Sequence, residues 1–192
     1  MSYQLGEKSS KVIGMLKAAI SADGREENDF YPTPIEAIIA LARAERLPQR
    51  IWEPACGQGH IGKTLEQLGH TVVATDLIYR GYGRGGVDFL STTQRSVDAL
   101  VTNPPFGRLG PRFVEHAINL EYPYIAMLLN VNFWHAANRQ RLWDSRPPSR
   151  IYALCWRLAF TGSGRPYFNC IWCVWDSENV DTRYARMRHP FK

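Results

Sequence analysis

The tetrapeptide Asn103-Pro104-Pro105-Phe106 combines residue types that suit the recognition of an amine on a ring. It follows the apolar run 99–101 after a single threonine, so we expect a strand to end there. The prolines fix φ and lack a backbone donor, which leaves the Pro104 carbonyl and the Asn103 side-chain oxygen as acceptors beside the Phe106 ring. Two such acceptors can bind both hydrogens of an exocyclic amine and stabilise the charge that develops when its nitrogen attacks.

The exocyclic amine of adenine is a poor nucleophile, because its lone pair is delocalised into the ring. Hydrogen bonds to Asn103 and Pro104 would localise that lone pair, and Phe106 would stack on the base. With Pro105, these residues are the candidate catalytic residues. The alternative is a plain turn after a strand, because Asn-Pro and Pro-Pro are common turn sequences.

A glycine-rich loop follows another expected strand. Residues 51–55 are expected to form a short buried strand that leads into Cys56-Gly57-Gln58-Gly59-His60-Ile61-Gly62 and then into a helix that ends near Leu68. Glycines let the backbone approach a ligand closely, and a helix start offers unpaired N–H groups. The arrangement favours a nucleotide-like ligand; the alternative is tight packing of helix on strand without one.

Two acidic residues follow further strand candidates. Asp76 ends the run 71–75 and could accept hydrogen bonds from both hydroxyls of a ribose. Asp88 follows a third candidate strand in the region 86–90 and could meet the adenine amine of a cofactor. In a parallel sheet the glycine loop, Asp76 and Asn103 would share the carboxyl edge and one crevice. A helix cap or turn role for Asp76, and a loop role for Asp88, are the alternatives.

The glycine loop also matches G-x-G-x-x-G, so a nicotinamide-dependent dehydrogenase is a further alternative. Glu53 stands directly before the loop, where its carboxylate would repel a pyrophosphate. A sulfonium cofactor carries a positive charge and no phosphate, which fits Glu53 better.

With these motifs in this order, the chain resembles the class I S-adenosylmethionine-dependent methyltransferases over about residues 29–176. Within them it is similar to the adenine-specific amino-methyltransferases of DNA, most closely to the short phage and prophage members. The resemblance is carried by Asp29-Phe30-Tyr31-Pro32-Thr33-Pro34, Glu53-Pro54-Ala55-Cys56-Gly57-Gln58-Gly59, Asp76, Asp88-Phe89 and Asn103-Pro104-Pro105-Phe106.

The resemblance implies an α/β, Rossmann-like fold: a mostly parallel seven-stranded sheet, helices on both faces and an antiparallel last strand. It implies S-adenosyl-L-methionine as cofactor and the tetrapeptide as the site of chemistry. The cofactor-binding residues that it implies are Tyr31, Thr33, Pro34, Glu53, Pro54, Ala55, Cys56, Gly57, Gly59, Asp76, Leu77, Asp88, Phe89 and Asn103.

Two features limit the transfer of function. Sequence-specific relatives carry a sizeable target-recognition region, and no segment of that size remains in this chain. The same tetrapeptide type occurs in RNA adenine and guanine methyltransferases and, with Tyr in place of Phe, in enzymes that methylate a glutamine amide. Phe106 favours adenine without deciding between DNA and RNA.

The remaining chain alternates between helix and strand signals. We expect a helix over 35–45, with Thr33 as its N-cap and Pro34 as its first residue. Further elements are expected as helix 111–120, strand 124–130, helix 136–143, strand 150–155 and strand 170–175.

Three parts are expected: an N-terminal extension (1–28) with an amphipathic helix over 8–20, a methyltransferase domain (29–180) and a basic C-terminal tail (181–192). With 192 residues, 45% of them hydrophobic, the chain can form one sizeable core. No apolar run reaches the roughly 20 residues of a membrane span, and the first residues lack the apolar core of a signal sequence. We therefore expect a cytoplasmic protein without membrane contact.

The net charge of +5 favours a polyanionic partner, most simply nucleic acid. Arginines flank the expected crevice, and the segment 160–168 combines glycines, Arg165 and Tyr167 in a way that could hold an extruded base. The four cysteines lack the spacing of a zinc site, and no metal is expected.

The sequence thus predicts a methyltransferase that acts on the 6-amino nitrogen of adenine in DNA. An RNA adenine methyltransferase and a non-catalytic nucleic-acid-binding subunit of the same fold remain alternatives, and the oligomeric state is open.

Overall fold

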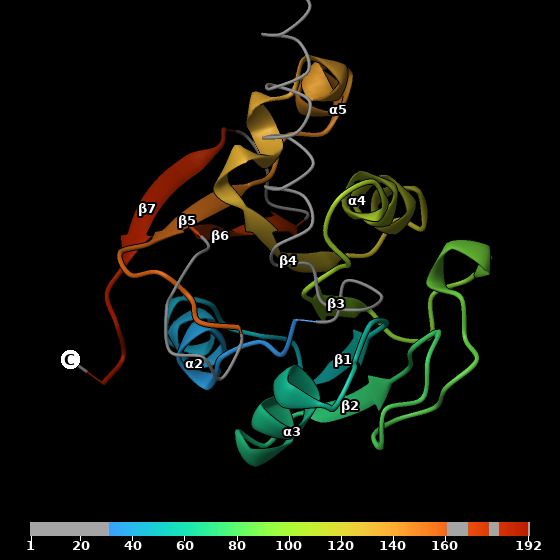
Figure 1. Cartoon of the computed structure of the whole chain (residues 1–192). Helices are drawn as coiled ribbons and strands as arrows, with labels where there is room; N and C mark the ends of the chain where they lie inside the picture. Colours follow the sequence, from blue (N-terminus) through green and yellow to red (C-terminus); the bar gives the residue numbers. More distant parts are fainter. Residues whose placement is uncertain (1–30, 161–168, 177–180, 192) are drawn as a thin grey trace, which may run out of the picture. The chain divides into compact units, whose positions relative to one another are not determined.

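The computed structural model describes residues 31–160, 169–176 and 181–191 (Figure 1). The helix expected over 8–20 and the loop residues 161–168 lie outside the described residues.

A seven-stranded sheet with the order β2-β1-β3-β4-β6-β5-β7 organises the molecule (Figure 1). Its strands are β1 (Arg50–Glu53), β2 (Thr71–Ala74), β3 (Ala99–Thr102), β4 (Tyr124–Asn130), β5 (Arg150–Leu154), β6 (Cys170–Asp176) and β7 (Arg183–Met187). Neighbouring strands are parallel except around β6, which is antiparallel to both β4 and β5. The mostly parallel sheet with an inserted antiparallel strand confirms the predicted fold class.

Helices cover both faces of this sheet (Figure 1). Helices α2 (Ile35–Ala44) and α3 (His60–Gln67) contribute their apolar sides to one hydrophobic cluster. Helix α4 (Leu109–Asn119) packs in the cluster on the opposite face, and the short α5 (Gln140–Ser145) lies against the same cluster.

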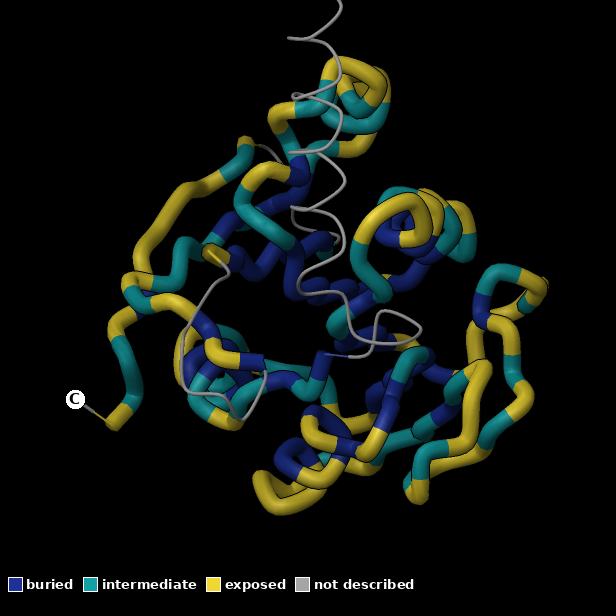
Figure 2. The backbone as a smooth tube through the Cα atoms, in the orientation of Figure 1, coloured by how far each residue is buried: buried dark blue, intermediate teal, exposed yellow. Residues whose placement is uncertain are grey.

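Strand β4 is buried on both faces, as expected for a central strand of a parallel sheet (Figure 2). Tyr124, Ala126 and Leu128 belong to the cluster with α2 and α3, whereas the residues between them belong to the cluster with α4. Next to it on β6, Trp172 is fully buried and donates its indole N–H to the Ala37 carbonyl at 3.0 Å. This bond fixes α2 to the sheet.

The chain leaves β1 toward β2 on one side and later returns to β3 on the other side. The carboxyl ends of β1 and β3 therefore flank the point where the strand order reverses, which is where open α/β sheets bind ligands. The glycine loop follows β1 and Asn103 follows β3, so the fold brings these two motifs to that point.

The prediction of a third strand over 86–90 is wrong. Gly86 has φ +73°, and Phe89–Ser91 form the 3-10 helix η2. The Asp88 carboxylate caps η2 by accepting from the backbone N–H of Leu90, a local hydrogen bond that competes with strand pairing.

The seventh strand comes instead from the segment predicted as a basic tail. Arg183–Met187 pairs in parallel with β5, and of these five residues only Met187 is buried. The exposed arginines give this segment no apolar alternation, and the open edge of β5 supplies the pairing that makes it a strand. The boundaries predicted for the three parts of the chain otherwise stay predictions.

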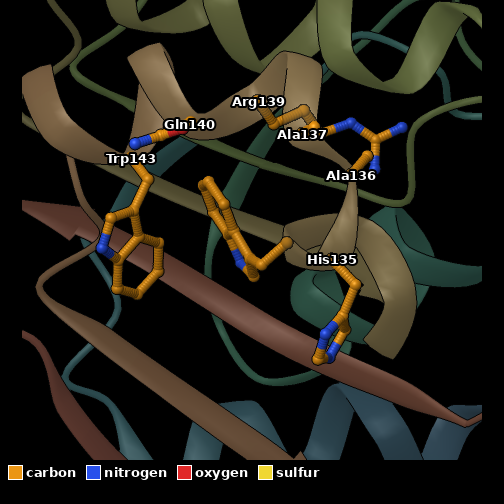
Figure 3. Close-up of a pocket in the computed structure, with 7 residues that line it drawn as sticks. His135, Ala136, Ala137, Arg139, Gln140 and Trp143 are labelled. Carbon is orange, nitrogen blue, oxygen red and sulfur yellow. The ribbon is translucent and has the colours of Figure 1, made fainter.

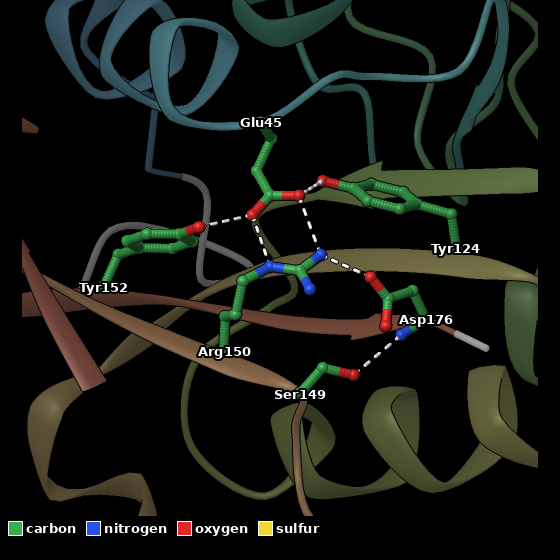
Figure 4. Close-up of polar contacts among 6 residues, drawn as sticks. All are labelled: Glu45, Tyr124, Ser149, Arg150, Tyr152 and Asp176. Carbon is green, nitrogen blue, oxygen red and sulfur yellow. Dashed lines mark hydrogen bonds and ion pairs between the residues drawn. The ribbon is translucent and has the colours of Figure 1, made fainter. Parts of the chain in front are cut away.

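An ion-pair network closes the amino edge of the sheet (Figure 4). Arg150 donates to both carboxylate oxygens of Glu45, at 2.6 and 2.9 Å, and also to Asp176. Tyr124 and Tyr152 donate their hydroxyls to the same Glu45 carboxylate. The Glu45 and Asp176 side chains are only 6% and 14% exposed, so their charges depend on Arg150.

We expect Arg150→Ala to lower the free energy of unfolding by about 3 kcal/mol, because it leaves two buried carboxylates without their partner. Urea unfolding measures the loss. The control Arg157→Ala removes an exposed arginine and should change stability by less than about 0.5 kcal/mol. Equal unfolding midpoints for the two variants would contradict the role of the network.

Candidate active site

Asn103 uses its side-chain amide to join two motifs that lie far apart in the sequence. Its Nδ2 donates to the Tyr31 carbonyl at 3.2 Å and to Thr33 Oγ1 at 3.1 Å. These bonds hold the segment before α2 at the carboxyl end of β3.

These two bonds also fix which way the Asn103 amide faces. The Tyr31 carbonyl can only accept, so the amide nitrogen must point toward it and the oxygen away. Asn103 Oδ1 is buried and has no hydrogen-bond partner among the described residues. A buried acceptor without a partner is costly, and such an atom marks a position where a ligand donor fits.

The bond to Asn103 also corrects the role predicted for Thr33. Pro34, not Thr33, occupies the N-cap position of α2, and no side chain caps that helix. Thr33 is only 3% exposed, and its hydroxyl accepts from Asn103 instead. A sequence pattern cannot distinguish these two uses of one hydroxyl, because the competing partner lies 70 residues further along the chain.

Three aromatic rings meet beside Asn103. The Tyr31 and Phe106 rings have centroids 4.7 Å apart, and Phe160 meets each of them edge to face at 5.8 and 5.7 Å. Tyr31 and Phe160 are buried, whereas Phe106 is half-buried. Tyr31 and Phe160 therefore both pack against Phe106, which follows Asn103 by three residues.

The glycine loop and Asp76 come together as predicted from the shared sheet edge. Gly57 and Gly59 have φ of +52° and +84°, a conformation that favours glycine. Asp76 accepts from the Gly57 N–H at 2.8 Å with one carboxylate oxygen and from the Ile78 N–H at 2.8 Å with the other. Each oxygen keeps capacity for one more hydrogen bond.

The Glu53 carboxylate occupies the start of α3 beneath this loop. Its side chain is buried, and Oε2 accepts from the Gly62 N–H, in the first turn of α3, at 2.8 Å. Burial raises the pKa of Glu53 well above its ordinary value, and the bond from Gly62 opposes that shift less strongly. A pyrophosphate would need this same helix start, so the geometry counts against a dinucleotide site.

Tyr82 covers the glycine loop, a contact that sequence analysis missed. A Cβ atom built on Gly59 or Gly62 would come within 2.4 Å of Tyr82 atoms. The Tyr82 hydroxyl donates to Glu66 on α3, and burial raises its pKa. Glycine at positions 59 and 62 is therefore needed for Tyr82 to pack, independently of any pyrophosphate.

Other predicted cofactor residues lie differently. Phe89 is 2% exposed and packs edge to face on Trp52, whereas the Leu77 side chain is 63% exposed. The Asp88 carboxylate is already bonded to Leu90 and Ser91 of η2. Of the loop residues, Pro54 and Cys56 are buried and Ala55 is half-buried. A cofactor role for any of these residues stays a prediction.

The part of the chain that the structure describes contains no group of three or more His, Cys, Asp or Glu side chains that could hold a metal ion. Cys170 and Cys173 belong to the hydrophobic clusters on opposite faces of β6, and burial raises the pKa of each thiol to about 12. None of the described helices is long and apolar enough to cross a membrane.

Comparison with known proteins identifies the fold. No protein-family model matches the chain, and no curated protein sequence matches it either. Among solved structures, a presumed RNA methyltransferase from Pyrococcus horikoshii is similar, with a TM-score of 0.60 and 13% identity over 84% of this chain and 96% of that one. The modification subunit of a presumed type I restriction enzyme from Vibrio vulnificus has a TM-score of 0.51 and 13% identity over 96% of this chain, which spans 53% of the subunit.

A third similar structure is the 1,6-didemethyltoxoflavin-N1-methyltransferase from Burkholderia thailandensis, with bound S-adenosylhomocysteine. Its TM-score is 0.50, with 13% identity over 91% of this chain and 92% of that one. At these identities the similarity shows a shared fold, the Rossmann-like fold of methyltransferases.

We expect Glu53→Gln to change how stability depends on pH. The folded state raises the pKa of Glu53 above about 4.5 and therefore favours the protonated carboxyl group. The stability that this protonation contributes is fully present below about pH 4.5 and is lost as the pH rises. Glutamine cannot ionise, so the free energy of unfolding of the variant should rise relative to that of the unmutated protein as the pH increases above about 4.5.

Urea unfolding at several pH values measures this difference, with the exposed Glu115→Gln as the control. A difference between Glu53→Gln and the unmutated protein that stays constant with pH would show that burial does not shift the Glu53 pKa.

Proposed function

We propose that this protein transfers a methyl group from S-adenosyl-L-methionine to the 6-amino nitrogen of adenine in DNA. The observation that carries the proposal is Asn103 Oδ1, which is buried, has no partner among the described residues and lies at the carboxyl end of β3, where the strand order reverses. This acceptor, with the Phe106 ring three residues further along the chain, suits an amine on a planar base.

The carboxyl edge of the sheet fits the cofactor. Asp76 has acceptor capacity left for the ribose hydroxyls, and Gly57 and Gly59 bring the loop backbone close to the crevice. The Tyr31–Thr33 segment, tied to Asn103, would lie over the methionine part. When bound, S-adenosyl-L-methionine supplies an electrophilic methyl group on a sulfonium. The fold neighbour from B. thailandensis holds the product form of this cofactor.

In the proposed reaction Asn103 Oδ1 accepts one amino hydrogen of the adenine and the Pro104 carbonyl accepts the other. These bonds localise the nitrogen lone pair and stabilise the positive charge that develops on the nitrogen. Phe106 stacks on the base, and the Tyr31 and Phe160 rings that pack against it fix its orientation. The nitrogen bonds to the methyl carbon as the carbon–sulfur bond breaks, and the methylated nitrogen then releases one proton to water.

A nucleic acid is the substrate that the surrounding charge favours. Arg108 and Arg112 follow the tetrapeptide and are exposed, so they can contact phosphates beside the crevice. The base must leave its stack to reach Asn103, as in other enzymes that act on a base. The similarity to a restriction-modification subunit supports DNA, and the similarity to a presumed RNA methyltransferase makes RNA the alternative to be tested.

We expect Asn103→Ala to lower the rate of methyl transfer by about 10²- to 10³-fold, because an acceptor for the reacting amine is lost. The measurement uses labelled S-adenosyl-L-methionine with unmethylated DNA or total RNA, followed by digestion to nucleosides. The unmutated protein should yield N6-methyldeoxyadenosine. The control Asn119→Ala changes an exposed asparagine on α4 and should retain full activity.

Each other outcome revises a different part of the proposal. Full transfer by Asn103→Ala would overturn the mechanism, and label in RNA alone would keep the mechanism but replace the substrate. Calorimetric binding of NADH, without binding of S-adenosyl-L-methionine, would replace the cofactor.

We expect Phe106→Ala to raise the KM for the nucleic acid about tenfold, because stacking of one base contributes about 1–3 kcal/mol. The Kd for S-adenosyl-L-methionine, measured by calorimetry, should change much less. Phe191→Ala, which removes a 59% exposed ring near the C-terminus, is the control. An unchanged KM in Phe106→Ala would exclude stacking of the base on this ring.

A further inference from the structure

A pocket of about 430 Å³ lies beyond the end of β4 (Figure 3). Here the chain turns through two 3-10 helices, η3 (Val131–His135) and η4 (Ala137–Arg139), into α5. The pocket is lined by Trp134, His135, Ala136, Ala137, Arg139, Gln140 and Trp143. Figure 3 shows the Trp143 and His135 side chains bordering it on two sides.

The two tryptophans form a rigid aromatic wall. Trp134 and Trp143 are half-buried, and their ring centroids are 4.9 Å apart at an interplanar angle of 72°. Trp134 also donates its indole N–H to Cys173 Sγ at 3.3 Å, which fixes the wall to β6. Rings held in this way lose little freedom when a planar ligand stacks on them.

Arg139 gives the same pocket a positive charge and an unused donor. Its guanidinium lies 4.3 Å from the centre of the Phe133 ring and donates to the Phe133 carbonyl. Its Nε is buried and has no hydrogen-bond partner among the described residues. Gln140 and His135, both exposed, add further hydrogen-bonding groups at the mouth.

This combination selects the chemistry of the ligand. Paired tryptophans can also enclose an organic cation, but the lining here contains no carboxylate and includes Arg139, which would repel a cation. A planar ring with acceptor atoms on its edge, attached to phosphates, satisfies both the aromatic wall and the positive charge. A nucleobase has this chemistry, and stacking on aromatic rings is how proteins hold unpaired bases.

The pocket lies on the same sheet edge as the candidate active site. Thr102, the last residue of β3, is opposite Met127 of β4, and β4 continues to Asn130. Strand β4 therefore extends three residues beyond the level at which β3 ends, about 10 Å at about 3.3 Å per residue, and the pocket-forming segment follows it.

We infer that this pocket holds an unpaired base of the substrate strand that flanks the target adenine. The inference rests on the proposed function, and it gives the protein a second position at which it reads the sequence that flanks the target adenine. The Trp134–Trp143 wall stacks on the base, and Arg139 with Gln140 meets its edge.

Binding of a short fluorescein-labelled DNA strand with one central adenine, measured by fluorescence anisotropy, tests the pocket without requiring catalysis. We expect Trp143→Ala to raise the Kd about tenfold and Trp143→Phe to restore most of the affinity. Arg139→Ala should weaken binding more than Arg141→Ala, which removes the same charge from an exposed position outside the pocket lining. Circular dichroism verifies that each variant is folded.

A set of strands with one base removed at each position in turn identifies the base. Removal of the base that occupies the pocket should weaken binding by the unmutated protein but not by the Trp143→Ala protein. Base removal and the substitution delete the same contact, so their effects should not add. Additive losses at every position would overturn the inference, as would equal affinities of the Arg139→Ala and Arg141→Ala proteins.

Parallel transfer assays separate this proposal from the proposed function. Strand binding that depends on Trp143, without any methyl transfer, would keep the pocket and remove the reaction. Transfer that depends on Asn103, with an unchanged KM in Trp143→Ala, would keep the reaction and remove the pocket.

Discussion

The two hydrogen bonds donated by the Asn103 amide determine the geometry of the whole candidate site. They use both amide hydrogens on the segment before α2, which leaves the side-chain oxygen as an acceptor without a partner in the part of the chain that the structure describes. The same bonds place the Tyr31 ring against Phe106. Trp172 binds α2 to the sheet, so the buried core fixes the position of the segment that precedes α2.

The ion-pair network and the candidate active site lie at opposite edges of the sheet. At the amino edge, the Glu45 and Asp176 carboxylates are paired with Arg150, and two tyrosines complete the bonding of Glu45. At the carboxyl edge, buried polar atoms such as Asn103 Oδ1 and Arg139 Nε lack partners among the described residues. The network at the amino edge and the two-sided core supply stability that offsets the cost of these unsatisfied groups.

Local sequence signals predicted the parts of the fold that local forces determine. The apolar runs of β3, β4 and β6 identified the strands, and the motif order predicted that Asn103 and Asp76 share one edge. What the sequence could not show depends on distant partners: Thr33 bonds to Asn103, and the arginine-rich β7 exists because β5 has an open edge. Tyr82 was missed because its fit over Gly59 and Gly62 appears only once the loop after β2 folds back.

The place of β6 in the sheet has a consequence for the synthesis of the chain. β6 lies between β4 and β5, although it follows both in the sequence, so β5 and β7 can join the sheet only through it. Until Asp176 has left the ribosome, β4 is the edge of an unfinished sheet, with unpaired backbone groups and apolar side chains on both faces. The synthesis of residues 170–176 therefore decides whether the nascent chain closes its own edge or pairs with another chain.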